Sequence, residues 1–217
     1  MASRPTTRPP APRPATTRRR LSGPERRALI LDAALRAFAA NGYDGAAMDE
    51  IAEAAGISKA VVYDHVPSKR DLYTQLLHGI RTEIERLVEA ALRTTGNDGE
   101  ERVRAAVEAI YRYVEEHPEA SRLLILELQG ANVSAIGREL EEKLTAVVSR
   151  TLRSETAAFG GRRDRELQLT LLAELLKSVV LGGASWWYRH PDVARTDLVA
   201  RSVGVIWPAI ERALVPA

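Results

Sequence analysis

The chain has 217 residues, 45% of them hydrophobic, and contains no cysteine. This length allows one large or two modest domains with a buried core, and the lack of cysteine excludes disulfides and thiolate metal sites. The net charge is +2, but residues 1–23 contain six arginines and no acid, so the rest of the chain is net acidic.

Residues 1–23 are rich in Pro, Thr and Arg and offer little apolar surface to pack. They are therefore predicted to form a disordered basic arm. Two interpretations stay open: a passive leader or misassigned start, and an arm that binds phosphates or enters a minor groove. No apolar stretch follows the arginines, so a secretory signal is not expected.

The first predicted helix covers residues 25–41, where Leu31, Leu35 and Phe38 follow the spacing of an amphipathic helix. Gly42 ends it. A second short helix follows and ends at Gly56, because a residue without Cβ suits a left-handed turn.

Ser58 stands at the N-cap position of a third helix over residues 58–65. Only Val62 and Val66 are predicted to turn firmly inward. The residues expected to face outward are Lys59, Ala60, Val61, Tyr63 and Asp64. Two short helices joined by a turn with Gly are typical of the helix-turn-helix, whose second helix reads the DNA major groove.

The run from Arg27 to Leu72 resembles the N-terminal domain of TetR-type transcriptional regulators. The matching residues are Ile30-Leu31, Ala33-Ala34, Phe38, Gly42-Tyr43, Ile51-Ala52, Ala55-Gly56-Ile57-Ser58, Val62-Tyr63, His65, Ser68-Lys69 and Leu72. Two positions depart from the pattern. Ala47 stands where Ser or Thr usually caps the second helix, so a cap worth about 1 kcal/mol is missing, and Val66 replaces the commoner Phe. The resemblance implies a DNA-binding domain over residues 24–70.

The resemblance also implies phosphate contacts at Tyr63 and Lys69, which orient a helix on DNA without reading its sequence. Lys59 can donate to guanine, and Ala60 and Val61 can contact a thymine methyl. His65 is either a further phosphate contact or a structural helix-terminal residue, while Asp64 either accepts from cytosine or pairs with Lys59. The predicted DNA-binding set is Ser58, Lys59, Ala60, Val61, Tyr63, Asp64, His65 and Lys69.

Beyond residue 70 only helices are predicted, so the fold class is all-α: a three-helix N-terminal domain with a helix-turn-helix and a larger helical domain over residues 71–217. A long helix opens at Ser68, with Asp71 completing its cap, and runs to about Thr95. Further helices are expected before Pro118 and over residues 119–129, 134–153, 163–189 and 193–214, giving about nine in all. The helix over 119–129 is expected to be buried on several faces.

The last two helices carry apolar residues on more than one face, for example Leu172 and Leu176 on one and Leu171 and Leu175 on another. A helix that is apolar on two faces needs two packing partners. The resemblance implies a homodimer through residues 163–214. The alternative is the buried central helix of a monomer.

The resemblance further implies an inducer pocket in the body. Its candidate residues are Tyr111, Tyr113, Glu127, Gln129, Asn132 and Trp186, although an exposed helix edge is the favoured interpretation of Glu127. Glu174 and Lys177 are predicted to be a solvated pair. They also interrupt the apolar run from 167 to 188, so no membrane span is expected. No cofactor and no metal site is expected.

The function implied is a cytoplasmic repressor that a small-molecule ligand releases from a palindromic operator in double-stranded DNA. A ligand-independent architectural DNA-binding protein is the alternative. An α-helical enzyme is a third hypothesis, but no catalytic residue set or glycine-rich phosphate loop supports it.

Overall fold

The computed structural model describes residues 22–96, 98–129 and 162–214, together with residues 138, 142 and 145. Every regular element in these residues is a helix, which confirms the predicted all-α fold. The eight helices are α1 (Gly23–Gly45), α2 (Met48–Ala54), α3 (Lys59–His65), α4 (Lys69–Thr94), α5 (Gly99–Glu116), α6 (Pro118–Gln129), α8 (Arg162–Tyr188) and α9 (Arg195–Leu214). The helix predicted over 134–153 lies outside the described residues, apart from three isolated positions.

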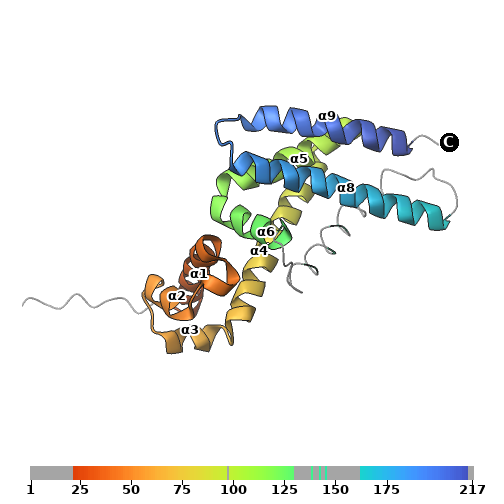
Figure 1. Ribbon diagram of the computed structural model, residues 1–217. Coiled ribbons are helices and arrows are strands. Elements are labelled where there is room, and N and C mark those ends of the chain that lie inside the picture. Colours follow the sequence, from red (N-terminus) through yellow and green to blue (C-terminus); the bar gives the residue numbers. More distant parts are fainter. Residues whose placement is uncertain are drawn as a thin grey trace, which may run out of the picture.

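Helices α1, α2 and α3 form a small head at one end of the molecule (Figure 1). α1 begins with a capping box, in which Ser22 Oγ accepts from the Glu25 backbone N–H and the Glu25 carboxylate accepts from the Ser22 N–H. The helical backbone is interrupted at Gly42, where φ is 71°. Ala47 gives α2 no side-chain cap, as predicted. Gly56 makes the left-handed turn toward α3 with φ of 68°.

α4 connects the head to the body (Figure 1). It begins at Ser68, whose Oγ accepts from the Asp71 backbone N–H as predicted. Its first half joins a core that also contains residues of α1, α2, α3, α5 and α6. The largest fully buried side chains in this core are Phe38, Ile30, Ile51, Leu72, Leu77, Leu123, Val62 and Val66. The core therefore continues across residue 70.

α6 lies where the head meets the body and contacts α1, α4 and α5. Its residues Ala120, Leu123 and Leu124 are buried in the first core. The sequence predicted burial on several faces of this helix, but Leu126 is exposed. The prediction is wrong for Leu126, which lies at the edge of the side formed by Ala120, Leu123 and Leu124 and is left exposed.

α5, α8 and α9 enclose a second core around Tyr111 and Trp187, whose rings meet edge to face with centroids 6.1 Å apart. The Tyr111 hydroxyl shares a hydrogen bond of 2.8 Å with Ser202 Oγ. α8 passes close to this hydroxyl at Gly183, where an added Cβ would lie 2.3 Å from the Tyr111 oxygen. The missing side chain at Gly183 therefore permits the close approach of α8 to α5.

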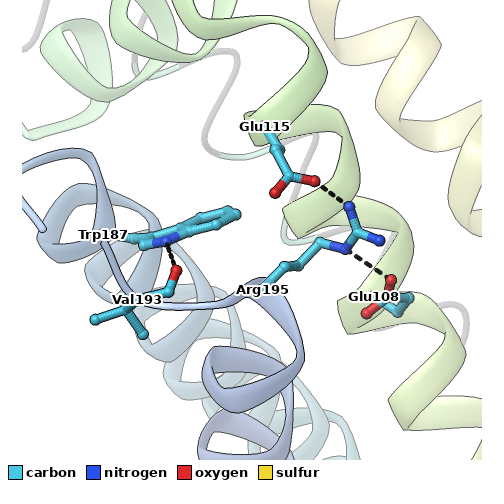
Figure 2. A network of polar contacts seen from close by, with 5 residues as sticks. All are labelled: Glu108, Glu115, Trp187, Val193 and Arg195. Atoms are coloured by element: carbon cyan, nitrogen blue, oxygen red, sulfur yellow. Dashed lines mark hydrogen bonds and ion pairs between the residues drawn. The ribbon is translucent and has the colours of Figure 1, made fainter. Parts of the chain in front are cut away.

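Arg195 fixes the start of α9 to α5 (Figure 2). Its Nε donates to Glu108 Oε1 at 2.8 Å, and its Nη1 donates to the Glu115 carboxylate. The two acids are two helical turns apart and so lie on one face of α5. Beside them, Trp187 Nε1 donates to the Val193 carbonyl at 2.8 Å. Together these bonds hold the corner between α8 and α9 against the body.

α8 has one buried face and one exposed face. Leu172 and Leu176 are buried in the second core, whereas Leu167, Leu171 and Leu175 are 70%, 57% and 56% exposed. The two apolar faces predicted for this helix are therefore present, and the second core covers only one of them among the residues that the structure describes.

The stretch from Glu166 to Tyr188 is long and apolar enough to cross a membrane, by length and composition alone. It also contains an ion pair whose lysine is buried and whose glutamate is exposed. The Lys177 side chain is only 5% exposed, lies 2.7 Å from Glu174 Oε2 and donates to Thr145 Oγ1 at 3.0 Å. The predicted solvated pair is thus wrong for Lys177, which packs against Thr145 inside the body.

The close approach at Gly183 predicts a position-specific loss of stability. Gly183→Ala should lower the free energy of unfolding by about 1–3 kcal/mol, because the new methyl group overpacks the buried Tyr111 hydroxyl. Gly79→Ala is the matched control, since nothing lies within 4 Å of a Cβ there. That variant should be stabilised by up to about 1 kcal/mol through helix propensity. Urea denaturation measures both, and equal effects would contradict the packing argument.

Candidate nucleic-acid interface

α3 presents its outward face as a short exposed surface. Ser58 Oγ accepts from the Val61 backbone N–H at 3.4 Å and begins the helix. Val62 and Val66 are fully buried and anchor α3 to the head. The side chains of Lys59, Ala60, Tyr63 and Asp64 are exposed, and that of Val61 is half-buried. The predicted division into inward and outward residues is therefore observed except at Val61, which is only half-exposed. DNA contact by these residues stays a prediction.

Lys59 pairs with a residue that the sequence did not suggest. Its Nζ lies 2.9 Å from Asp49 Oδ1 and 3.0 Å from Asp49 Oδ2 on α2. The hydrogen bond and the charge of Asp49 raise the pKa of Lys59. The alternative pairing of Lys59 with Asp64 is therefore not the one formed. No local pattern could reveal the Asp49 contact, because the two residues lie in different helices, ten positions apart.

Two further residues of the predicted DNA-binding set, Lys69 and His65, lie at the start of α4 and at the end of α3. Lys69 is half-buried; its Nζ donates to the Asp44 carbonyl at 3.2 Å and lies 4.9 Å from the centre of the Tyr43 ring. His65 is half-buried at the end of α3, with its Cε1 4.0 Å from the position of a Cβ on Gly23. The chain therefore enters α1 beside the end of α3.

The residues proposed for an inducer pocket do not form one cluster in the described structure. Tyr111 belongs to the second core and Tyr113 to the first. Trp186 is exposed and stacks on His190, with ring centroids 4.1 Å apart. Gln129 ends α6, and Asn132 lies outside the described residues.

Glu127 is buried, with 8% of its surface exposed, so the favoured interpretation of an exposed helix edge is wrong. It accepts a hydrogen bond of 2.6 Å from Tyr73 on α4. The Tyr73 ring packs edge-on against Phe38 and Tyr43, each with centroids 5.0 Å apart. This contact places a carboxylate of α6 directly against the aromatic core of the head. The sequence did not indicate the partner, which lies 54 residues away.

Comparison with known proteins agrees with this arrangement. Residues 30–76 match the family model described as bacterial regulatory proteins, tetR family. The head of the chain is therefore similar to the N-terminal domain of TetR-family regulators. It is 44% identical over 105 residues to the HTH-type transcriptional activator FasR of Mycolicibacterium smegmatis, a match that covers 48% of each chain. The match to FasR thus spans about half the length of that relative.

Solved structures extend the likeness to the TetR fold as a whole. A TetR-like regulator from Rhodococcus sp. RHA1 has a TM-score of 0.70 at 22% identity, covering 88% of this chain and 99% of its own. FadR from Bacillus subtilis, in complex with stearoyl-CoA, has a TM-score of 0.63 at 19% identity, covering 85% and 97%. At these identities the likeness establishes the fold, including the helical body that follows the TetR head.

The buried tyrosines predict a loss of stability at alkaline pH. Burial raises the pKa of Tyr73, as does its hydrogen bond to Glu127. Burial also raises the pKa of Tyr111 and raises that of Tyr113 to about 12. These phenols ionise more readily in the unfolded chain, so their contribution is complete below pH ~10 and falls as the pH rises further.

Each such tyrosine should change the free energy of unfolding by at most about −1.4 kcal/mol per pH unit above pH ~10. Urea denaturation at a series of pH values measures the slope. Tyr73→Phe removes one contribution and should make the slope shallower. A slope that this substitution leaves unchanged would contradict the assignment.

Proposed function

We propose that this protein is a homodimeric transcriptional regulator that binds a palindromic operator and leaves it when an acyl-CoA ester occupies the body. The observation that carries the proposal is the exposed face of α3, held on the head by Val62 and Val66. A helix-turn-helix of this geometry lays its second helix in the major groove. The proposed base contacts are Lys59, Ala60 and Val61, and the proposed phosphate contacts are Ser58, Tyr63, His65 and Lys69.

The dimer proposal rests on the exposed face of α8. Leu167, Leu171 and Leu175 are spaced by four residues and so form one stripe along the helix. Gly182 is exposed near the far end of α8, and Val205 is an exposed apolar residue of the neighbouring α9. A contiguous apolar surface of this kind on a soluble protein marks an interaction site. Residues 163–214 would thus form a twofold interface that joins two heads.

Acyl-CoA is proposed as the ligand class because FadR, which shares the fold, was solved with stearoyl-CoA. The described body supplies the apolar side chains that an acyl chain needs, above all in the second core. Tyr73 and Glu127 offer a route from the body to the head, since a shift of α6 would move the carboxylate that Tyr73 contacts. A ligand need change DNA affinity by only about 1–3 kcal/mol to act as a switch.

The proposed sign of regulation is repression, by occupation of an operator near a promoter. FasR is named an activator, so the transcript level in a deletion strain distinguishes the two signs. We propose a cytoplasmic location, and we propose that the protein is not an enzyme. The architectural alternative would bind DNA without sequence preference and would not respond to a ligand.

The proposal predicts a specific, ligand-sensitive DNA complex. Full-length protein should protect a palindromic site upstream of its own or a neighbouring gene, and stearoyl-CoA should weaken that binding by about fivefold or more. Footprinting and fluorescence anisotropy measure the two effects, with free coenzyme A and stearate as controls. Equal affinity for scrambled DNA would refute the proposal that the protein binds a specific operator. Specific binding that no acyl-CoA weakens would refute the ligand class alone.

The exposed stripe predicts the oligomeric state. Leu175→Arg should raise the dimer dissociation constant by about 100-fold or more, because each subunit loses a buried leucine and gains a charge. Leu126→Arg is the matched control, since Leu126 is an exposed leucine of α6 outside the stripe. Analytical ultracentrifugation should show monomers for the first variant only. A wild-type protein that is monomeric at micromolar concentration would overturn the dimer.

A further inference from the structure

The ion pair between Lys59 and Asp49 joins the first residue of α3 to the first turn of α2. The two side chains are 52% and 71% exposed. Ion pairs this exposed to solvent contribute little to the stability of a fold. The buried contacts of Val62 and Ile51 already attach α3 and α2 to the head. The pair therefore calls for an explanation other than stability.

The exposed charged residues of α2 and α3 are mostly acidic. α2 carries exposed Glu50 and Glu53 beside Asp49, and α3 carries exposed Asp64. Lys59 is the one lysine or arginine within α2 and α3. A free lysine on this surface would be attracted to DNA phosphates of any sequence. The carboxylate of Asp49 opposes that attraction, because it neutralises the ammonium and repels phosphate.

Asp49 leaves Lys59 able to read a base. An ammonium group has three N–H donors, so it can keep the carboxylate and still donate to O6 or N7 of guanine. The N-terminal residues of a recognition helix are those that contact base edges. A lysine stem is long and flexible, so a fixed partner at 2.9–3.0 Å restricts where its ammonium lies.

We infer that Asp49 is a specificity-determining residue, which holds Lys59 in position for a base edge and prevents its use as a general phosphate contact. The inference rests on the proposed function, and it concerns how the same surface discriminates between sequences. Asp49 itself acts as a positioning residue through Lys59.

The test compares three variants of the full-length protein, Asp49→Ala, Asp49→Asn and Glu50→Ala. Each binds the operator and a set of operators changed at single base pairs, over a range of salt concentrations. Asp49→Ala should lower discrimination at one G·C pair of each half-site by about fivefold or more, the low end of what one base contact supplies. It should also steepen the dependence of log K on log salt by about one, as expected for one additional phosphate contact.

Glu50→Ala is the matched control, because Glu50 is also an exposed acid in the first turn of α2 but is not among the groups that raise the pKa of Lys59. It should tighten binding to all sequences alike and leave discrimination unchanged. Asp49→Asn keeps an oxygen that accepts from the ammonium and should lie between Asp49→Ala and the wild type. In the Lys59→Ala background, Asp49→Ala should no longer affect discrimination.

Three outcomes would count against the inference. If Asp49→Ala and Glu50→Ala change the affinity for every sequence by the same factor, Asp49 acts only as a charge that repels phosphate. Unchanged discrimination by Asp49→Ala, with a wild type that does discriminate, would overturn the role of Asp49 alone. A wild type that binds every sequence equally would overturn the proposed operator binding together with this inference. Thermal melts of each variant establish that the compared proteins are folded.

Discussion

The head and the body share one hydrophobic core, and the rest of the structure depends on that continuity. α4 contributes Leu72 and Leu77 to the same cluster as Phe38 of the head and Leu123 of α6. Moving the head against the body therefore requires repacking of close-packed side chains, which favours a few discrete arrangements over gradual bending. The buried bond between Tyr73 and Glu127 adds a directional contact at this junction.

The head was predictable from sequence because its information is local. Gly56 needs a left-handed backbone, Ser58 caps the next helix, and Val62 recurs at helical spacing with Val66, so each element could be identified within a few residues. The body helices that the structure describes were predicted in the same way from apolar spacing. The helical fold and the outward face of α3 therefore followed from short-range patterns and the family resemblance.

The contacts that specify the candidate site were not predictable, because they join residues far apart in the chain. Nothing near Glu127 indicates that Tyr73 lies opposite, and an acid in a leucine-rich helix is equally consistent with an exposed edge. Lys177 was misjudged for the same reason, since Thr145 stands against it. In a helical protein, periodicity identifies the face of a residue, whereas the element packed on that face follows from the tertiary fold.

The acidic character of the head has a consequence for how a dimer of this kind would bind DNA. α2 and α3 together carry one basic side chain, so they attract DNA phosphates weakly. Non-specific binding by these helices is therefore weak, and fewer non-operator sites on DNA compete for the protein. Joining two heads would then raise operator affinity, because a second contact made within one complex adds affinity without adding charge to either head. Two features of the structure would divide these tasks: the exposed stripe of α8 at Leu171 and Leu175, and the restrained ammonium of Lys59. One would supply affinity by pairing the heads, and the other would keep each head selective.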